Sequence, residues 1–209
     1  MARTSLKRLS GIDRSGGPPP ETQKGQPLRP WTIPNAISYV RLALLPVFLV
    51  VALGSGDGRD PTAAVLYFVI AWGDQLDGLA ARLTGQYSRL GALLDPLTDR
   101  ALVIAGVVVC WHFELLPRWA LAVLVAREIA MLILAQVGLR VGMDLKINMV
   151  GRWAVWPVMF AIFLSLIVDS WVSIASLYLG LALTLWATAI YFADGYRFMQ
   201  ARRRPSSST

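Results

Sequence analysis

The chain has 209 residues, of which 56% are hydrophobic and only 16% are charged, and its formal net charge is +7. The charged fraction is far below the roughly 25% of an ordinary soluble domain. Because the apolar residues gather in long runs, this composition argues against a soluble helical bundle, whose helices need charged outer faces. The positive charge does not require nucleic acid as a partner, because a basic tail beside anionic membrane lipid accounts for it. A single cysteine and a single histidine argue against a disulfide and a zinc site.

The ends of the chain differ in composition from its middle. Residues 1–33 are polar, basic and proline-rich. Such a stretch cannot bury enough apolar surface to fold, and it predicts a disordered basic tail rather than a signal peptide. The sequence then predicts a membrane domain over residues 34–200 and a short polar tail over residues 201–209.

Apolar runs separated by short polar or proline-containing turns predict an all-α fold with six transmembrane helices. With its flanking residues, each run approaches the roughly 20 residues that a helix needs to cross a bilayer. The expected spans are residues 34–54, 62–84, 89–112, 117–141, 147–168 and 172–198.

The distribution of basic residues predicts the orientation in the membrane. Lysine and arginine gather in the two tails and in the connections that follow the second and fourth expected spans. Six spans place these regions on one side of the membrane, and the positive-inside rule makes that side the cytoplasm. We therefore expect both termini in the cytoplasm.

Four acidic residues lie within the second and third expected spans, where an ionisable group costs free energy and is a functional candidate by default. Asp74 and Asp77 are three residues apart, and Asp95 and Asp99 are four apart, so each pair lies on one helix face. Asp77 and Asp95 are each nine residues from Gln86, the centre of the turn between the spans. In an antiparallel hairpin the four carboxylates therefore converge at similar depths, on the cytoplasmic side.

The converging carboxylates predict a metal site, because they cannot all stay ionised in a poorly solvated place without cations. Oxygen ligands select hard divalent ions, so the pattern predicts two Mg²⁺ or Mn²⁺ ions. Two metal ions suit an in-line displacement at phosphorus. Beside them, Gly78 and Gly91 leave space where a nucleotide could approach the backbone, and Arg82 is placed to meet a phosphate.

Other interpretations of these residues stay open. The glycines could serve helix packing alone. Structural salt bridges could pair Asp77 with Arg82 and Asp99 with Arg100, although this leaves Asp74 and Asp95 unpaired. A metal-ion transporter also places carboxylates in a membrane. It would distribute them over several spans, whereas here they lie in one hairpin.

The spacing of these residues is that of a known signature. Asp74 is followed by the run Asp77-Gly78-Leu79-Ala80-Ala81-Arg82, then by eight residues to Gly91, three to Asp95 and three to Asp99. This gapped pattern resembles the signature of the CDP-alcohol phosphatidyltransferases at every fixed position. The motif covers 26 residues, and the expected six-span layout extends the resemblance to most of the chain beyond the first tail.

The resemblance implies roles for the motif residues. Asp74, Asp77 and Asp95 would bind metal, and Asp99 would be linked to metal binding and act as the general base on the acceptor hydroxyl. The alkoxide would attack the diacylglycerol-linked phosphorus of CDP-diacylglycerol, and CMP would leave. The CDP-lipid site would be lined by Gly78, Ala81, Arg82 and Gly91. The resemblance also implies a homodimer in a bacterial inner membrane, with a cytoplasmic active site.

The acceptor alcohol is suggested by weaker features. Pro34, Asn35, Arg41 and Pro46 resemble the first span of bacterial phosphatidylglycerophosphate synthases and of the cardiolipin synthases built on the same fold. The stretch Ala126-Arg127-Glu128-Ile129 resembles the glycerol-phosphate enzymes. Arg100 and Gln136 depart from them, standing where lysine and arginine are usual, and leave cardiolipin synthesis from phosphatidylglycerol open.

We expect a small anionic acceptor, glycerol-3-phosphate, which needs cationic partners. Arg127, Lys146 and Arg152 are the candidates for holding its phosphate. The alternative is a structural pair of Arg127 with Glu128, with the other two cations belonging to the positive-inside belt.

Overall fold

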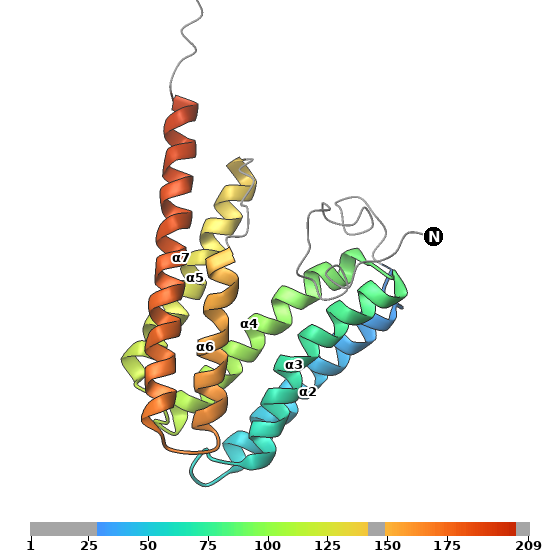
Figure 1. Ribbon diagram of the computed structural model, residues 1–209, viewed down its shortest axis with the longest axis vertical. Helices are drawn as coiled ribbons and strands as arrows, with labels where there is room; N and C mark the ends of the chain where they lie inside the picture. Colours follow the sequence, from blue (N-terminus) through green and yellow to red (C-terminus); the bar gives the residue numbers. More distant parts are fainter. Residues whose placement is uncertain (1–28, 142–148, 204–209) are drawn as a thin grey trace, which may run out of the picture. The chain divides into compact units, whose positions relative to one another are not determined.

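The computed structural model describes residues 29–141 and 149–203, without the side chains of residues 135–141, 149–153 and 194–203. All regular secondary structure in these ranges is helical, as predicted. The helices are α2 (Ile33–Gly54), α3 (Pro61–Thr84), α4 (Arg89–His112), α5 (Arg118–Val141), α6 (Met149–Ser165) and α7 (Trp171–Arg203) (Figure 1).

The helix bounds follow the six expected segments closely. The main differences are at the C-terminal ends of the last two: α6 ends at Ser165 and α7 continues to Arg203. The expected polar tail at residues 201–209 therefore begins inside a helix. Most of the expected tail at residues 1–33 lies outside the described residues.

The chain forms two compact units, Met1–Val109 and Cys110–Thr209. In the first unit α2 packs along α3, and α4 returns from the turn at the end of α3. In the second unit α7 packs against α6 and α5. The four aspartates of the motif all belong to the first unit.

Local signals in the sequence set the ends of the first two helices. Thr32 caps α2 by accepting a hydrogen bond from the backbone N–H of Asn35, and Asp60 caps α3 by accepting one from Ala63. Gly85 ends α3 with a positive φ of 66°, a conformation that glycine adopts without strain. The chain can therefore turn sharply between the two aspartate pairs.

Hydrogen bonds join the start of α2 to the turn between α3 and α4. Ser88 Oγ donates to Asn35 Oδ1 at 2.8 Å, and the backbone N–H of Ile33 donates to Gln86 Oε1 at 3.0 Å. Ser88 Oγ also accepts from the N–H of Gly91 at 2.9 Å. These bonds hold three helix ends together and bring α2 beside the aspartate hairpin.

The interior of the first unit changes character along α2. Its buried face is polar near the N-terminus and apolar towards the C-terminus, where Phe48 lies against Tyr67 of α3 with ring centroids 5.4 Å apart. The buried residues of α2 are Pro34, Asn35, Ser38, Arg41, Leu45, Phe48 and Ala52. The apolar part anchors the helix pair, and the polar part faces the aspartates.

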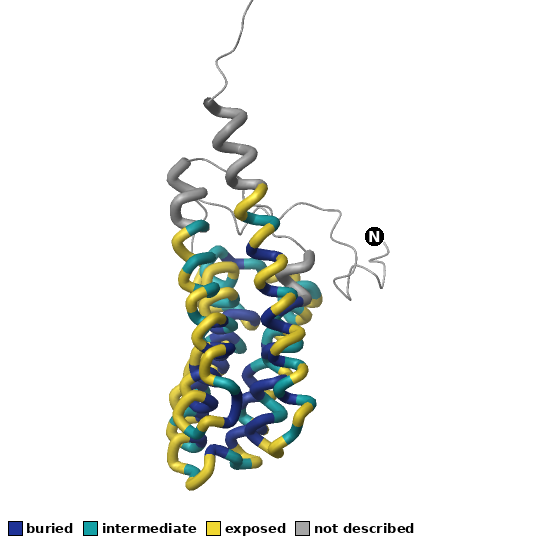
Figure 2. The backbone as a smooth tube through the Cα atoms, turned by 90° about the vertical axis from the view of Figure 1, so that its left-hand side faces the viewer, coloured by how far each residue is buried: buried dark blue, intermediate teal, exposed yellow. Residues whose placement is uncertain are grey.

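Two of the described helices are long and apolar enough to cross a membrane by length and composition: α2, and residues 171–193 of α7. The charges of the site lower the hydropathy of α3 and α4, so the six-span arrangement stays a prediction. On α3, large apolar side chains nevertheless remain exposed at helical spacing: Val65, Phe68, Trp72, Leu76 and Leu83. Figure 2 shows how exposed and buried residues alternate along the backbone.

Candidate functional site

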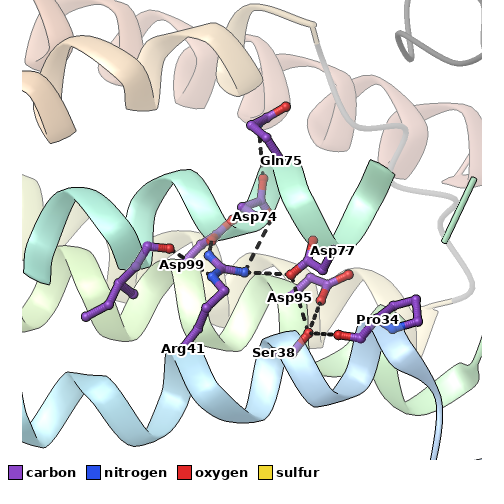
Figure 3. Close-up of polar contacts among 9 residues, drawn as sticks. Pro34, Ser38, Arg41, Asp74, Gln75, Asp77, Asp95 and Asp99 are labelled. Atoms are coloured by element: carbon purple, nitrogen blue, oxygen red, sulfur yellow. Dashed lines mark hydrogen bonds and ion pairs between the residues drawn. The ribbon is translucent and has the colours of Figure 1, made fainter. Parts of the chain in front are cut away.

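The centre of the site is the guanidinium of Arg41, which α2 inserts among the aspartates (Figure 3). Its Nη1 donates to Asp77 Oδ2 at 3.0 Å, and its Nη2 donates to Asp99 Oδ1 at 2.8 Å. Asp74 Oδ1 lies 3.7 Å from Nη1. One buried cation thus contacts carboxylates from both helices of the hairpin.

The rest of the Arg41 side chain, which we call its stem, is held in place as well as the guanidinium, which we call its head. Nε donates to the carbonyl of Ile70 at 2.8 Å, and the side chain is only 3% exposed. Gly73 provides the space for it, because a Cβ at this position would lie 2.6 Å from Arg41 Cδ. The glycine is therefore required by the arginine that passes over α3.

Ser38, one turn before Arg41 on α2, connects the remaining aspartate. Its hydroxyl lies 3.2 Å from Asp95 Oδ1, 3.4 Å from Asp77 Oδ2 and 3.2 Å from the carbonyl of Pro34. A hydroxyl has one proton, so it donates to one of these oxygens at a time. Together Ser38 and Arg41 bring the four motif aspartates into one polar cluster.

The aspartates differ in their access to solvent. The side chain of Asp77 is 4% exposed, whereas those of Asp74 and Asp99 are 34% and 38% exposed. Asp77 therefore lies in the interior of the cluster, and Asp74 and Asp99 lie at its open edge. Asp95 is also partly exposed, so Asp77 is the one aspartate of the cluster that a water-soluble molecule cannot meet without rearrangement.

Sequence reasoning found the aspartates but gave no role to Ser38 or to the guanidinium of Arg41. A signal was present, because Arg41 is the single charged residue of α2 and a charge inside an apolar helix is a functional candidate. Asn35, Ser38 and Arg41 also recur every three residues, which places them on one helix face. Helix spacing alone does not tell which other helix this face meets.

The residues expected around a nucleotide divide into two groups. Gly78 is open, since a Cβ there would meet only the Arg82 guanidinium, at 3.7 Å. Arg82 Nε is buried without a hydrogen-bond partner among the described residues, and Ala81 is partly exposed one position before it. At Gly91 a Cβ would lie 2.7 Å from Asn35 Oδ1, so helix packing already accounts for that glycine.

The donor set of the cluster fits a hard divalent cation, because it consists of carboxylate and hydroxyl oxygens. Among the described residues no three acidic, histidine or cysteine side chains gather closely enough to form a metal site. The expected direct approach of the carboxylates is replaced by contacts through Arg41. Asp77 and Asp99 each accept a hydrogen bond from the guanidinium through one carboxylate oxygen. The second oxygen of each carboxylate is the one that a metal ion would bind.

The residues expected to bind the acceptor lie in the second unit. Arg127 on α5 donates to Glu128 and, through Nε at 2.9 Å, to Thr188 Oγ1 on α7. It is thus held in the pair that the sequence offered as its structural alternative. Lys146 lies outside the described residues, and so does the side chain of Arg152.

The sequence that forms this cluster matches a family of known proteins. Residues 31–186 match the family model described as CDP-alcohol phosphatidyltransferase, and this range contains α2, the hairpin and the whole aspartate cluster. The chain belongs to the CDP-alcohol phosphatidyltransferase family. The resemblance recognised in the motif is thereby confirmed. Members of this family generally depend on divalent metal ions.

Relatives within the family carry two different names. A cardiolipin synthase (CMP-forming) of Streptomyces coelicolor is 34% identical over 197 residues, which cover 90% of this chain and 92% of that protein. A CDP-diacylglycerol–glycerol-3-phosphate 3-phosphatidyltransferase of Bacillus subtilis is 31% identical over 144 residues, or 63% of this chain and 75% of that protein. An enzyme of the same name from Shigella flexneri is 31% identical over 176 residues, covering 78% and 94%.

Proposed function

We propose that this phosphatidyltransferase transfers the phosphatidyl group of CDP-diacylglycerol to glycerol-3-phosphate, releasing CMP and forming phosphatidylglycerophosphate. The observation that carries the proposal is the gathering of four motif aspartates from α3 and α4 around Arg41 and Ser38, within the range that matches the family. The names of the Bacillus and Shigella relatives support this acceptor.

The metal-binding role falls to Asp74, Asp77, Asp95 and Asp99, which would hold two Mg²⁺ or Mn²⁺ ions. When bound, such ions neutralise charge on the diphosphate and on the departing CMP. The chain contributes the positions of the oxygens: Ser38 orients Asp95, and Arg41 orients Asp77 and Asp99.

We assign the role of general base to Asp99, as the family resemblance implies. Its side chain is 38% exposed, whereas that of Asp77 is 4% exposed, and a base must reach the hydroxyl proton of an acceptor. Arg41 holds one oxygen of Asp99, which fixes the direction of the other. The proton passes to Asp99 as the acceptor oxygen bonds to the diacylglycerol-linked phosphorus, and the bond from this phosphorus to CMP breaks.

The CDP-lipid would lie over Gly78, Ala81, Arg82 and Gly91. Arg82 Nε needs a hydrogen-bond acceptor, and a phosphate oxygen would satisfy it. Gly78 leaves the backbone beside this arginine accessible. The role of Gly91 is then indirect, because the space beside it belongs to Asn35.

Phosphatidylglycerol is the second candidate acceptor, which would make the product cardiolipin. The Streptomyces relative favours it, because that protein matches over 90% of this chain. Arg127 bears on the choice as well, because its guanidinium already donates to Glu128 and Thr188 and has fewer N–H groups left for a phosphate. Lys146 and Arg152 remain the other proposed cations for glycerol-3-phosphate.

We also propose a multi-pass protein of a bacterial inner membrane, with six spans, cytoplasmic termini and a homodimeric assembly. The two apolar helices and the exposed apolar face of α3 support the membrane location. The basic residues after the second and fourth spans support the orientation.

The acceptor is tested with purified protein, CDP-diacylglycerol and Mg²⁺ or Mn²⁺, with glycerol-3-phosphate and phosphatidylglycerol supplied separately. Product lipid and CMP are both quantified, and Asp99→Asn serves as the inactive control. We expect equal amounts of phosphatidylglycerophosphate and CMP with glycerol-3-phosphate. Cardiolipin formed from phosphatidylglycerol alone would transfer the assignment to the second candidate.

A further inference from the structure

Arg41 places a positive charge among the carboxylates to which the proposed function assigns metal ions. Its guanidinium lies 2.8 to 3.7 Å from carboxylate oxygens of three aspartates, on two helices other than its own. Four carboxylates brought together repel one another unless a cation lies between them. In the described structure that cation belongs to the chain itself.

The arginine is also built to remain in place. Nε is bonded to the Ile70 carbonyl, and the stem fills the space beside Gly73, where a Cβ would lie 2.6 Å away. A side chain held at its head, its Nε and its stem has little freedom to leave. The carboxylates must therefore share their oxygens between Arg41 and any further cation.

We propose that Arg41 is the resident counter-ion of the aspartate site, a positioning residue that keeps the carboxylates together without metal and opposes metal binding electrostatically. The inference rests on the proposed metal-dependent function. The four aspartates and Arg41 carry a formal charge of −3, and two divalent ions bring it to +1. Without Arg41 the loaded site would be neutral, so the arginine makes it attract a diphosphate.

Thermodynamic linkage predicts that the stabilisation of the protein by metal differs between the wild type and a variant without Arg41. If Arg41 supplies charge that metal also supplies, removing it destabilises the metal-free protein most, and added metal restores more stability than in the wild type. A role in packing alone would lower stability equally with and without metal. A role only in orienting metal ligands would reduce the stabilisation by metal.

The test uses Arg41→Gln, purified with Mn²⁺ and then freed of metal by a chelator. Breaking a buried ion pair should lower the metal-free Tm by on the order of 10 °C. We expect saturating Mn²⁺ to raise the Tm of the variant by more than it raises that of the wild type. Paramagnetic resonance titration should show Mn²⁺ binding about tenfold more tightly than in the wild type. Arg118→Gln removes a cation from the exposed pair with Glu114 and is the control. It should change neither the rise in Tm caused by Mn²⁺ nor the affinity for Mn²⁺.

A second variant covers the case in which Arg41→Gln does not fold. Gly73→Ala keeps every charge but displaces the aliphatic part of the Arg41 side chain. It should therefore increase the rise in Tm caused by Mn²⁺ and the affinity for Mn²⁺, each by less than Arg41→Gln does. Gly54→Ala is its matched control, since a Cβ at Gly54 meets nothing within 4 Å. Its Mn²⁺ binding and metal-induced rise in Tm should equal those of the wild type.

The experiment can contradict the proposed function and the counter-ion role of Arg41 separately. A wild-type Tm that Mn²⁺ does not raise would contradict the metal-dependent function and with it the role of Arg41. Mn²⁺ could instead raise the Tm of the wild type and raise that of Arg41→Gln by the same amount or less. This result would overturn the counter-ion role of Arg41 alone. Gly73→Ala takes the place of Arg41→Gln in this comparison if Arg41→Gln does not fold.

Discussion

The two units of the chain use their buried polar side chains in different ways. In the first unit, buried polar groups join one helix to another, as Arg41 of α2 does with Asp77 of α3. In the second unit, most buried hydroxyls donate to a carbonyl three or four residues earlier in the same helix. Ser165, Thr184 and Thr188 follow this pattern.

This difference in hydrogen bonding suggests that the first unit contains the functional site and that the second unit is a structural scaffold. Hydroxyls that donate to their own helix satisfy their polarity locally and leave most contacts between helices to apolar and small residues. Thr188 is an exception, because it also accepts a hydrogen bond from Arg127 of α5. In the second unit Gly180 of α7 meets Val158 of α6 in this way. Charges buried between helices are costly, and the first unit contains them in the motif that defines the family. We therefore assign the chemistry to the first unit.

The largest expected effect lies in the first unit, at Asp99. Asp99→Asn should lower kcat by about a thousandfold or more, because it removes the general base. Binding of CDP-diacylglycerol should fall less than in Asp74→Asn, since a metal ligand also shapes the site before the reaction. Both are measured by CMP release and by equilibrium binding of the CDP-lipid. Equal losses of binding in the two variants would remove the separate role of Asp99.

A change to the packing of the second unit should affect stability alone. At Gly180 a Cβ would lie 2.5 Å from Val158 Cγ2 and 2.9 Å from its backbone nitrogen, which cannot rotate away. Gly180→Val should therefore lower the free energy of unfolding by about 1 to 3 kcal/mol. Gly54→Val, where a Cβ meets nothing within 4 Å, is the matched control. If Gly180→Val weakened Mn²⁺ binding in the folded protein, the division between site and scaffold would fail.

Arg127 is one of the three cations proposed to hold the acceptor phosphate. If it holds the acceptor phosphate, Arg127→Gln should raise the KM for glycerol-3-phosphate roughly tenfold, and leave CDP-lipid affinity nearly unchanged. Thr188→Val removes the hydrogen bond from Arg127 Nε but keeps the charge of the guanidinium, so it should raise this KM less. If both variants lose stability and keep the wild-type KM, Arg127 belongs with Glu128 to the scaffold.

The smallest effect is expected at the exposed pair of Arg118 and Glu114. Their side chains are 48% and 69% exposed, so the pair is screened by solvent. Arg118→Gln should change the free energy of unfolding by less than about 1 kcal/mol and leave kcat unaltered. Thermal unfolding and CMP release measure the two quantities. A larger loss would show that charge pairs outside the first unit also support the fold.

The helices, and the gathering of the four aspartates in space, could be predicted from the sequence for one physical reason. Apolar runs, Asp60 and Gly85 are local signals, and they determine where helices begin and end. Helix periodicity likewise places Asp74 with Asp77 and Asp95 with Asp99 without knowledge of any other helix. Both kinds of inference use only neighbours in the chain.

Contacts between distant parts of the chain were not predictable in the same way. Arg41 meets Asp99, 58 residues later, and Asn35 fills the space beside Gly91. Both contacts depend on which face α2 turns towards the hairpin. Spacing within α2 shows a polar face but does not show its partner. The same limit explains why Gly91 was predicted to leave room for a nucleotide.

The central claim is that the aspartate cluster of the first unit performs a metal-dependent phosphatidyl transfer. CMP release from CDP-diacylglycerol, measured with glycerol-3-phosphate or phosphatidylglycerol as acceptor, tests it most directly in the wild type and in Asp95→Asn. We predict that CMP is formed only by the wild type, only with an acceptor and a divalent ion, and no longer after chelation. Acceptor-dependent CMP release that persists in folded Asp95→Asn, or in the presence of the chelator, would contradict the account.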